Sequence, residues 1–239
     1  MIKAGQRVLL KLSGEALGGA NGSGIDPATL DALVIQIKAT VDAGYGVAVV
    51  IGGGNIFRGV KGVAQGIDRA SADYMGMLAT VMNGVALVHA LNAKGAEAAL
   101  VSGLEVPKVA ETYQRDAALR HFEEGRLVVF SGGTGSPFFT TDTAAALRAA
   151  EMDCAAILKG TQVDGVYDAD PKTNTDAAFY ERVSYDEVLA NRLNVMDAAA
   201  IALARENNIP IIVFNIHRDD AFIRVLKGEE ICTIVDHGG

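Results

Sequence analysis

The stretch RVLLKLSGE, Arg7–Glu15, passes from an apolar run directly into a glycine-containing turn. The stretch GVAVVIGGGN, Gly46–Asn55, repeats this arrangement. Apolar runs that are continuous rather than alternating are typical of strands buried on both faces, as in a parallel sheet covered by helices. Similar runs predict further strands at Ala96–Val101, Arg126–Phe130, Ala155–Leu158, Ile211–Phe214 and Ile231–Val235.

Helical patterns fill the segments between these runs. The predicted helices are Pro27–Ala43, Asp68–Ala93, Arg115–Glu124, Asp142–Glu151, Tyr185–Asn191, Val195–Asn207 and Asp219–Lys227. Strands that alternate with helices predict an α/β fold, here a three-layer α/β/α sandwich around a central, mainly parallel sheet. The one polar, turn-rich stretch, Asp168–Ala177, is too short to separate two domains, so we expect residues 1–239 to form a single domain.

The composition fits a globular protein with a large core and narrows the choice of partners. The chain has 239 residues, of which 50% are hydrophobic and 21% are charged, and its net charge is −8. This acidic balance argues against a general nucleic-acid or anionic-membrane surface. The sequence shows no CxxC pair and no signal-peptide pattern. It also shows no apolar stretch that approaches the ~18 residues of a membrane span. We therefore expect a cytoplasmic protein with no membrane or nucleic-acid partner.

The predicted helix Asp68–Ala93 is apolar on more than one face. A helix of that kind is buried in a core or in an interface. Because a domain of this size can hardly bury so long a helix by itself, we expect the chain to form a homo-oligomer.

Glycine-rich loops follow four of the predicted strands. They begin at Ser13-Gly14, Gly52-Gly53-Gly54, Ser131-Gly132-Gly133 and Lys159-Gly160. In an open parallel sheet, ligands bind beyond the carboxyl ends of the strands, and glycine lets backbone amides approach a phosphate closely. One such loop could simply be a turn, but four at one edge favour a phosphate-binding cleft. The sequence has no GxxxxGK[ST] loop, no fitting GxGxxG fingerprint and no protein-kinase motifs. These absences argue against a P-loop nucleotide hydrolase, a dinucleotide dehydrogenase and a protein kinase.

Charged residues stand among these loops. Lys11 and Lys159 each end a strand beside a glycine, which favours a phosphate clamp over a solvated strand end. Arg58 could fork onto a phosphate or lie on the surface, and Asp142 could orient the lysines or cap a helix. Asp73 stands on the largely apolar helix, where a carboxylate needs a basic partner or a ligand hydroxyl.

The loops contain no obvious general base. The four histidines, His89, His121, His217 and His237, lie outside them without metal-ligand or triad spacing, so we expect no metal site built from side chains. Phosphoryl transfer to an acceptor that is already an anion needs no base, and a phosphate monoester with a second pKa near ~6 is such an acceptor. Cations, backbone amides and a Mg²⁺ ion bridging the phosphates would bring the two anions together.

Five motifs together resemble one family, the bacterial uridylate kinases of the amino acid kinase superfamily. They are KLSGE at Lys11–Glu15, GGGNIFRG at Gly52–Gly59, DYMGMLATVMN at Asp73–Asn83, GTGSPFFTTD at Gly133–Asp142 and VDGVY at Val163–Tyr167. The resemblance implies an amino acid kinase-like fold and phosphate transfer from ATP to UMP, giving ADP and UDP in pyrimidine nucleotide synthesis. It also implies Mg²⁺, held mainly by the nucleotide phosphates.

The resemblance also implies roles for individual residues. The implied catalytic residues are Lys11, Arg58, Asp142 and Lys159. The implied ATP contacts are Lys11, Leu12, Ser13, Gly14, Gly54, Arg58, Thr161, Tyr167 and Asp170. The implied UMP contacts are Gly53, Asp73, Thr134, Gly135, Ser136, Pro137, Phe138, Phe139, Thr140 and Thr141, with Asp73 receiving the ribose hydroxyls.

The family further implies a homohexamer built from dimers, activation by GTP and inhibition by UTP. The segment matching the GTP-responsive one is Gly19, Ala20, Asn21, Gly22, Ser23 and Gly24. Here Ser23 replaces an often aromatic residue, and Ser136 stands where asparagine is frequent. Two other hypotheses stay open: a kinase of the same superfamily that acts on an amino acid or a carbamate, and a non-catalytic protein of this fold that binds nucleotides or oxyanions.

Overall fold

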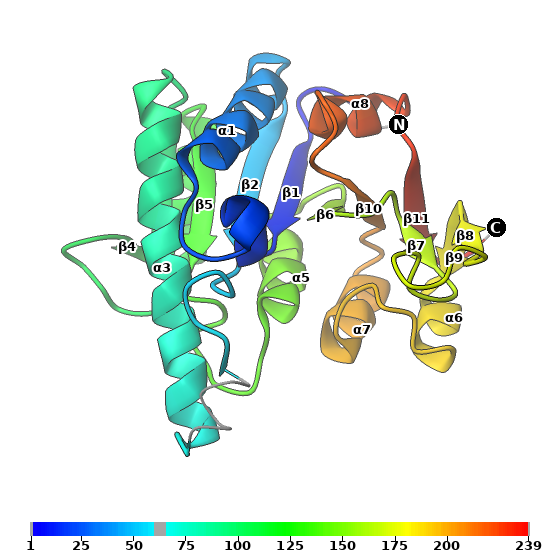
Figure 1. The fold of residues 1–239 in the computed structure, drawn as a ribbon. Helices are drawn as coiled ribbons and strands as arrows, with labels where there is room; N and C mark the ends of the chain where they lie inside the picture. The colour runs from blue at the N-terminus through cyan, green and yellow to red at the C-terminus, as the bar shows by residue number, and fades with distance from the viewer. Residues whose placement is uncertain (1, 60–65, 239) are drawn as a thin grey trace.

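The computed structural model describes residues 2–59 and 66–238, and within them nine strands form one sheet (Figure 1). From edge to edge these are β4 (Glu111–Thr112), β3 (Ala98–Ser102), β5 (Leu127–Ser131), β2 (Gly46–Ile51), β1 (Arg7–Leu12), β6 (Ile157–Thr161), β10 (Ile211–Asn215), β11 (Cys232–Asp236) and β9 (Arg182–Ser184). Neighbouring strands pair in parallel, apart from the antiparallel pair β10 and β11. The predicted, mainly parallel sheet is confirmed.

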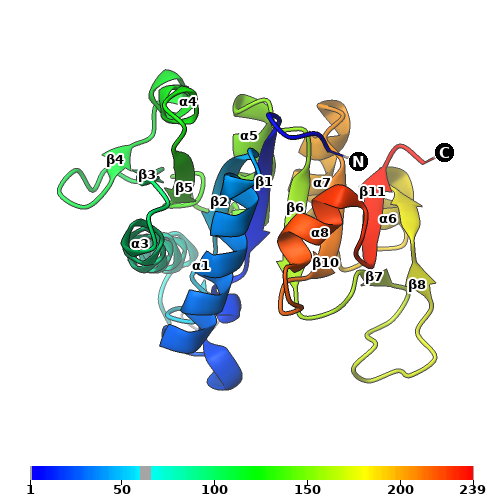
Figure 2. The same cartoon turned by 90° about the horizontal axis from the view of Figure 1, so that it is seen from above.

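Helices cover both faces of this sheet (Figure 2). One face carries α1 (Pro27–Asp42), α3 (Arg69–Ala93) and α8 (Ala221–Lys227). The other carries α4 (Arg115–Glu123), α5 (Thr141–Glu151), α6 (Tyr185–Ala190) and α7 (Ala198–Glu206). Two short 3₁₀ helices, η1 (Gly14–Leu17) and η2 (Gly19–Asn21), follow β1, and β7 (Val166–Tyr167) pairs with β8 (Phe179–Tyr180) in a separate hairpin. The arrangement is the three-layer α/β/α sandwich that the sequence predicts.

Two apolar clusters, one on each face, explain the continuous apolar runs. Val8 and Leu10 of β1 belong to one cluster, whereas Leu9 between them belongs to the other. All three side chains are fully buried, and each buried leucine contributes roughly 1.5–3 kcal/mol of transfer free energy. A strand that is anchored on both faces holds the loop at its end in a fixed position, and the glycine-rich loops follow such strands.

The central strands lie where the sequence predicts them. β1 and β2 have the expected bounds, whereas β3, β5, β6, β10 and β11 each end one to three residues later than expected. The difference arises because ladder pairing continues through residues that interrupt the apolar run, such as Gly160 and Thr161 in β6. The short strands β4, β7, β8 and β9 were not predicted, since two or three residues give too little apolar pattern to stand out.

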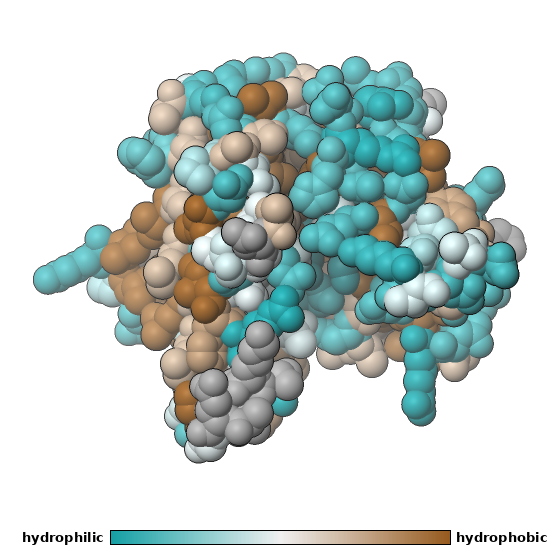
Figure 3. Space-filling model, in the orientation of Figure 1, coloured by the Kyte–Doolittle hydropathy of each residue, from teal (hydrophilic) through white to brown (hydrophobic). Residues whose placement is uncertain are grey.

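Helix α3 buries one side and exposes an apolar strip on another. Leu87 and Leu91 are fully buried, but Tyr74, Met75, Leu78, Met82 and Val85 are 40–57% exposed. Figure 3 shows hydrophobic surface gathered over this part of the molecule. By length and composition, α3 is also the one helix of the described residues that could cross a membrane, although polar residues interrupt its apolar sequence. In this fold it packs against the sheet as part of the sandwich.

Candidate active site

The loops that follow β1 and β2 touch each other backbone to backbone. Gly52 N donates to Leu12 O at 2.9 Å. A Cβ atom on Gly14 would lie 2.6 Å from Gly54 N and would collide with the side-chain oxygen of Asn55. Because only a residue without a side chain fits there, these two loops form one continuous rim at the carboxyl edge of the sheet.

A pair of asparagines joins this rim to α3. Asn83 is completely buried, and its Nδ2 donates to Gly52 O and to Asn55 Oδ1, each at 2.7 Å. Asn55 Nδ2 donates in return to Asn83 Oδ1 at 3.1 Å and also to Gly24 O at 2.6 Å. A buried amide needs such partners, so the pair fixes the position of the β2 loop. Neither side chain has a role predicted from the sequence.

Lys11, Asp142 and Lys159 meet where β1 and β6 end. The two lysines are register partners on neighbouring strands. Asp142, on the first turn of α5, forms an ion pair with Lys11 through Oδ1, and its Oδ2 lies 3.4 Å from Lys159 Nζ. The three side chains are only 8%, 16% and 16% exposed, and Lys159 also donates to Val195 O. One carboxylate thus holds two ammonium groups at a fixed spacing.

Asp142 is available to the lysines because another residue caps α5. Thr140 occupies the N-cap position, and its Oγ1 accepts a hydrogen bond from Asp142 N at 3.0 Å. The sequence allows Asp142 either to orient the lysines or to cap a helix. In the structure its side chain contacts the lysines, and Thr140 is the cap of α5.

Burial and charge act in opposite directions on these groups. Burial raises the pKa of the Asp142 carboxyl, but the charges of Lys11 and Lys159 outweigh it and hold that pKa below its usual value of 3.8. Burial is also the largest influence on Lys159 and lowers the pKa of its ammonium below the usual 10.5, although Asp142 opposes this. The carboxylate is therefore ionised at neutral pH, and Lys159 gives up its proton more readily than an ordinary lysine.

A cavity of about 480 Å³ opens between the β2 loop, α3 and the segment that precedes α5. Its lining is largely apolar or backbone, with a few polar side chains, as is typical of small-molecule sites. The lining residues are Gly53, Gly54, Phe57, Gly59, Arg69, Ala72, Asp73, Gly76, Met77, Thr80, Gly133, Phe139, Thr140 and Thr141. Five of the ten predicted UMP contacts are among them: Gly53, Asp73, Phe139, Thr140 and Thr141.

Asp73 has a basic partner inside this cavity. Arg69, one turn earlier on α3, places its Nε 2.9 Å from Asp73 Oδ2. Phe138 N donates to the same carboxylate at 2.8 Å, and the Arg69 guanidinium lies 5.8 Å from the centre of the Phe138 ring. Asp73 therefore connects α3 to the loop before α5, and Phe138 takes a left-handed backbone angle, φ 73°, at this point.

The other predicted UMP contacts lie in the same loop but outside the cavity lining that the described residues form. These are Thr134, Gly135, Ser136, Pro137 and Phe138. Thr134 Oγ1 accepts from Ser136 N and donates to Ser136 O, each at 3.1 Å, which closes this part of the loop on itself.

Two residues without a predicted role tie this loop to helices. Asp197, the N-cap of α7, accepts hydrogen bonds from Thr140 Oγ1 and, at 2.7 Å, from Thr143 Oγ1. Thr80 of α3 accepts from Gly132 N at 2.7 Å. The capping position of Asp197 could be read from the sequence, but its contact with residues more than fifty positions away could not.

Arg58 lies at the rim of the β2 loop, half exposed, rather than in the lysine centre. Its guanidinium is paired with Glu15 of the β1 loop, and its Nε lies 3.4 Å from Gly54 O. In this arrangement Arg58 and Glu15 add a charged contact between the two loops. The guanidinium remains accessible from solvent, as an arginine that receives a phosphate must be.

The residues predicted for the adenosine side follow Lys159 along the chain. Thr161 ends β6 and donates to Phe214 O at 3.2 Å, and Tyr167 of β7 packs edge-on against Phe179. Asp170 is exposed and accepts a hydrogen bond from Lys172 N at 2.9 Å. Because β2 and β6 flank β1 on opposite sides, this segment and the cavity lie on either side of Lys11.

The predicted GTP-responsive segment lies beside the same rim. Gly19, Gly22 and Gly24 all have left-handed backbone angles, and Gly24 N donates to Asn55 O at 2.9 Å. Among the described residues, no group of three or more His, Cys, Asp or Glu side chains is arranged to hold a metal ion.

Comparison with known proteins identifies the family. Residues 6–215 match the model of the amino acid kinase family. Uridylate kinase from Zymomonas mobilis is 57% identical over 96% of this chain and 95% of its own length, and that from Paramagnetospirillum magneticum is 54% identical over 96% of both. The crystal structure of UMP kinase from Bacillus anthracis superposes with a TM-score of 0.94 at 40% identity, over 98% of this chain and 97% of that one. The UMP kinase from Ureaplasma parvum gives 0.92 at 41% identity, over 98% and 100%. The chain therefore belongs to the uridylate kinases of the amino acid kinase family.

Proposed function

We propose that this protein transfers the γ-phosphate of ATP to UMP and so forms UDP for pyrimidine nucleotide synthesis. The observation that carries the proposal is the buried Lys11–Asp142–Lys159 centre beside a cavity of nucleotide-site size. Curated relatives named uridylate kinase, at more than 50% identity over nearly the whole chain, support UMP as the acceptor.

The proposed mechanism is direct, in-line transfer to the ionised phosphate of UMP. Since that phosphate is mostly an anion at neutral pH, the reaction needs no general base, and its main difficulty is the approach of two anions. Lys11 and Lys159 stabilise the charge on the transferring phosphoryl group, and Arg58 contributes from the rim. Asp142 keeps the two ammonium groups in place without moving a proton.

Magnesium would enter this site with the nucleotide. Both carboxylate oxygens of Asp142 face ammonium groups, and the described residues offer no cluster of metal ligands. We therefore propose that the nucleotide phosphates hold the Mg²⁺ ion, whose charge lowers the repulsion between the two substrates. The roles derived for the side chains do not depend on the position of that ion.

A coupled ADP-release assay with UMP, CMP, glutamate and aspartate tests the proposed function. We expect turnover with UMP well above that with the other acceptors. Turnover with an amino acid instead would favour another kinase of the superfamily. Binding of nucleotide without turnover would favour a non-catalytic protein, although Lys11, Asp142 and Lys159 together argue against that.

Replacement of Asp73 tests the acceptor cavity. We expect Asp73→Ala to weaken UMP binding about tenfold to a hundredfold, because hydrogen bonds to a charged group are each worth about 1.5–3 kcal/mol. Isothermal titration with UMP measures the effect, and Asp73→Asn, which keeps an acceptor for Phe138 N, should give a smaller one. Unchanged UMP affinity together with a lower melting temperature would show instead that the carboxylate serves only as a partner of Arg69.

The pH dependence of turnover tests Lys159. Because burial lowers the pKa of its ammonium below 10.5, its positive charge is lost as the pH rises through that lowered value. We expect kcat to fall on the alkaline side before an ordinary lysine would titrate. In Lys159→Arg the guanidinium stays charged, since its pKa exceeds about 12, so the residual activity should not fall in that range. Identical alkaline profiles of the two proteins would assign the decline to another group.

Three further properties belong to this proposal. The exposed apolar strip of α3 supports a homo-oligomer, and the resemblance supports a hexamer in the cytoplasm. A nine-stranded sheet that takes strands from both ends of the chain supports a single domain. GTP activation and UTP inhibition are expected of the family, and the Gly19–Gly24 segment, with Ser23 in place of an aromatic residue, is where a GTP response would be altered.

A further inference from the structure

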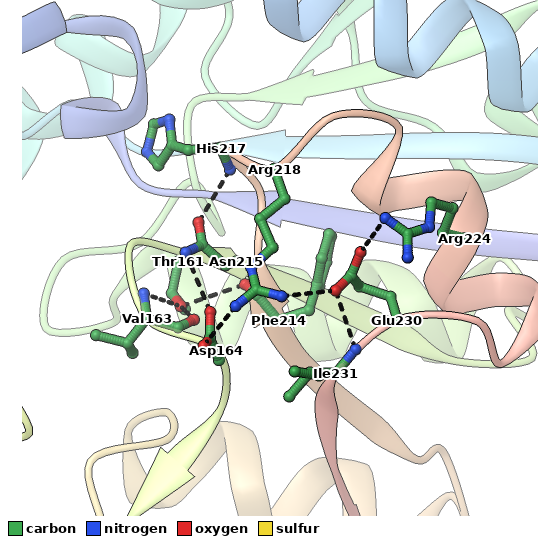
Figure 4. A network of polar contacts seen from close by, with 10 residues as sticks. All are labelled: Thr161, Val163, Asp164, Phe214, Asn215, His217, Arg218, Arg224, Glu230 and Ile231. Carbon is green, nitrogen blue, oxygen red and sulfur yellow. Dashed lines mark hydrogen bonds and ion pairs between the residues drawn. The ribbon is translucent and has the colours of Figure 1, made fainter.

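Four charged side chains form a network at the ends of β6 and β10, outside the lysine centre (Figure 4). They are Asp164, Arg218, Arg224 and Glu230. Arg218 is the central member. Its Nη2 lies 2.7 Å from Asp164 Oδ2, and its Nη1 lies 3.0 Å from Glu230 Oε1. A single guanidinium thus connects the loop after β6 to the loop before β11.

Glu230 anchors this network from the interior. Its side chain is only 2% exposed, and Arg224 Nη1 lies 2.9 Å from its second oxygen. Ile231 N also donates to Glu230 Oε1 at 3.1 Å. A buried carboxylate is stable only when it is paired and hydrogen-bonded. The position of Glu230 therefore determines where the guanidinium of Arg218 points.

Asp164 is the outward end of the network. Arg218 holds one of its oxygens, and Asn215 Nδ2 lies 3.3 Å from the other. Asn215 is itself the register partner of Thr161 at the end of β6. Thr161 Oγ1 accepts from Val163 N at 3.2 Å and so closes the turn between them. The β6–β7 loop is consequently held at the end of β10 through the contacts of Thr161 and Asp164.

The position of this loop gives the network its significance. The loop joins Thr161, the last residue of β6, to β7, which contains Tyr167; both residues are proposed contacts of the phosphate donor, and Lys159 also belongs to β6. The network pairs two cations with two carboxylates, so it adds no net charge beside a polyphosphate. Without Arg218, the carboxylate of Asp164 would keep Asn215 but lose its cationic partner, and the loop would lose its link to Glu230.

We propose that Arg218 is a positioning residue for the phosphate donor, which acts by holding the β6–β7 loop through Asp164 while Glu230 fixes its own orientation. This inference rests on the proposed function for the identity of the donor. Arg218 itself does not contact the transferring phosphate in this proposal. The expected signature is a loss of donor affinity that leaves UMP affinity unchanged.

The test compares Arg218→Met with a matched control, Arg205→Met. The two arginine side chains are similarly exposed, Arg205 at 38% and Arg218 at 39%. Arg205 forms an ion pair with a single carboxylate, that of Asp186 on α6, at 2.6 Å. Isothermal titration with a non-hydrolysable ATP analogue and with UMP is the readout, together with the KM values for ATP and UMP. For Arg218→Met we expect analogue affinity to fall about tenfold, the size of one lost ion-pair contact, and UMP affinity to stay within about twofold. Arg205→Met should change neither.

Arg218→Lys provides a second variant if Arg218→Met does not fold. A lysine ammonium is a point charge that reaches one of the two carboxylates at a time, so donor affinity should again fall while UMP affinity is retained. The inference is overturned if Arg218 variants bind the analogue as the Arg205 variant does, or if both ligands weaken in proportion to a lower melting temperature. Failure of the proposed function is a separate result, namely unsubstituted protein that binds the analogue but does not phosphorylate UMP.

Discussion

Replacement of Lys11 by alanine should lower turnover about a thousandfold while UMP binds almost as before, because loss of one preorganised charge donor to a transition state costs about a hundredfold to a thousandfold. Lys11 is nearly buried, is held by Asp142, and lies between the acceptor cavity and the proposed donor segment. An ammonium group in that place can interact more strongly with the phosphoryl group in the transition state than with either bound substrate. Steady-state kinetics with ATP and UMP, together with titration of UMP into the variant, separates the two effects.

A surface lysine serves as the control for that experiment. Lys38 of α1 also pairs with an aspartate, Asp42 at 2.6 Å, but on the exposed side of the helix. Lys38→Ala should leave kcat and both KM values unchanged, since exposed ion pairs contribute only about 0–1 kcal/mol. If Lys11→Ala turned over UMP as fast as the unsubstituted protein, Lys11 would have no part in the transfer.

The sheet could be predicted from the sequence because its evidence is local. In β1, the consecutive residues Val8, Leu9 and Leu10 point to alternate faces of the sheet and are all buried. The continuous apolar run therefore indicates that both faces are covered. The edge strands β4 and β9 have no continuous apolar run. They are two and three residues long, and their pairing depends on the neighbouring strands rather than on their own residues.

The candidate site could be predicted only in part for the same reason. Lys11 and Lys159 stand at the ends of recognisable strands, so their proximity follows once the strands are placed in register. The contact of Asp142 with both lysines did not follow from the local residues alone, which were also compatible with a helix cap. Asn83, Asp197 and Arg218 act through partners far away in the chain. No sequence periodicity reports such contacts.

The glycine at position 14 offers the sharpest test of the contact between the β1 and β2 loops. A methyl group there would sit 2.6 Å from Gly54 N and 2.9 Å from Gly52 O, and both atoms belong to backbone that Asn83 holds in place. The loops must then move apart. Overpacking of this kind costs typically 1–3 kcal/mol of unfolding free energy. Because Lys11 is the next-to-last residue of β1, the strand before this loop, we also expect kcat to fall about a hundredfold, the usual effect of a misplacement near 1 Å.

Gly54→Ala is the matched control for the stability measurement, since it changes the same junction without crowding it. The nearest heavy atoms to its Cβ would be Glu15 Oε1 at 3.9 Å and Arg58 Cγ at 4.0 Å, which are ordinary contacts. Urea unfolding should place Gly54→Ala within about 0.5 kcal/mol of the unsubstituted protein and Gly14→Ala clearly below both. A Gly14→Ala protein with full stability and full turnover would mean that the two loops can separate freely. In that case the rim would not be what holds Lys11 and the acceptor cavity in their relative positions.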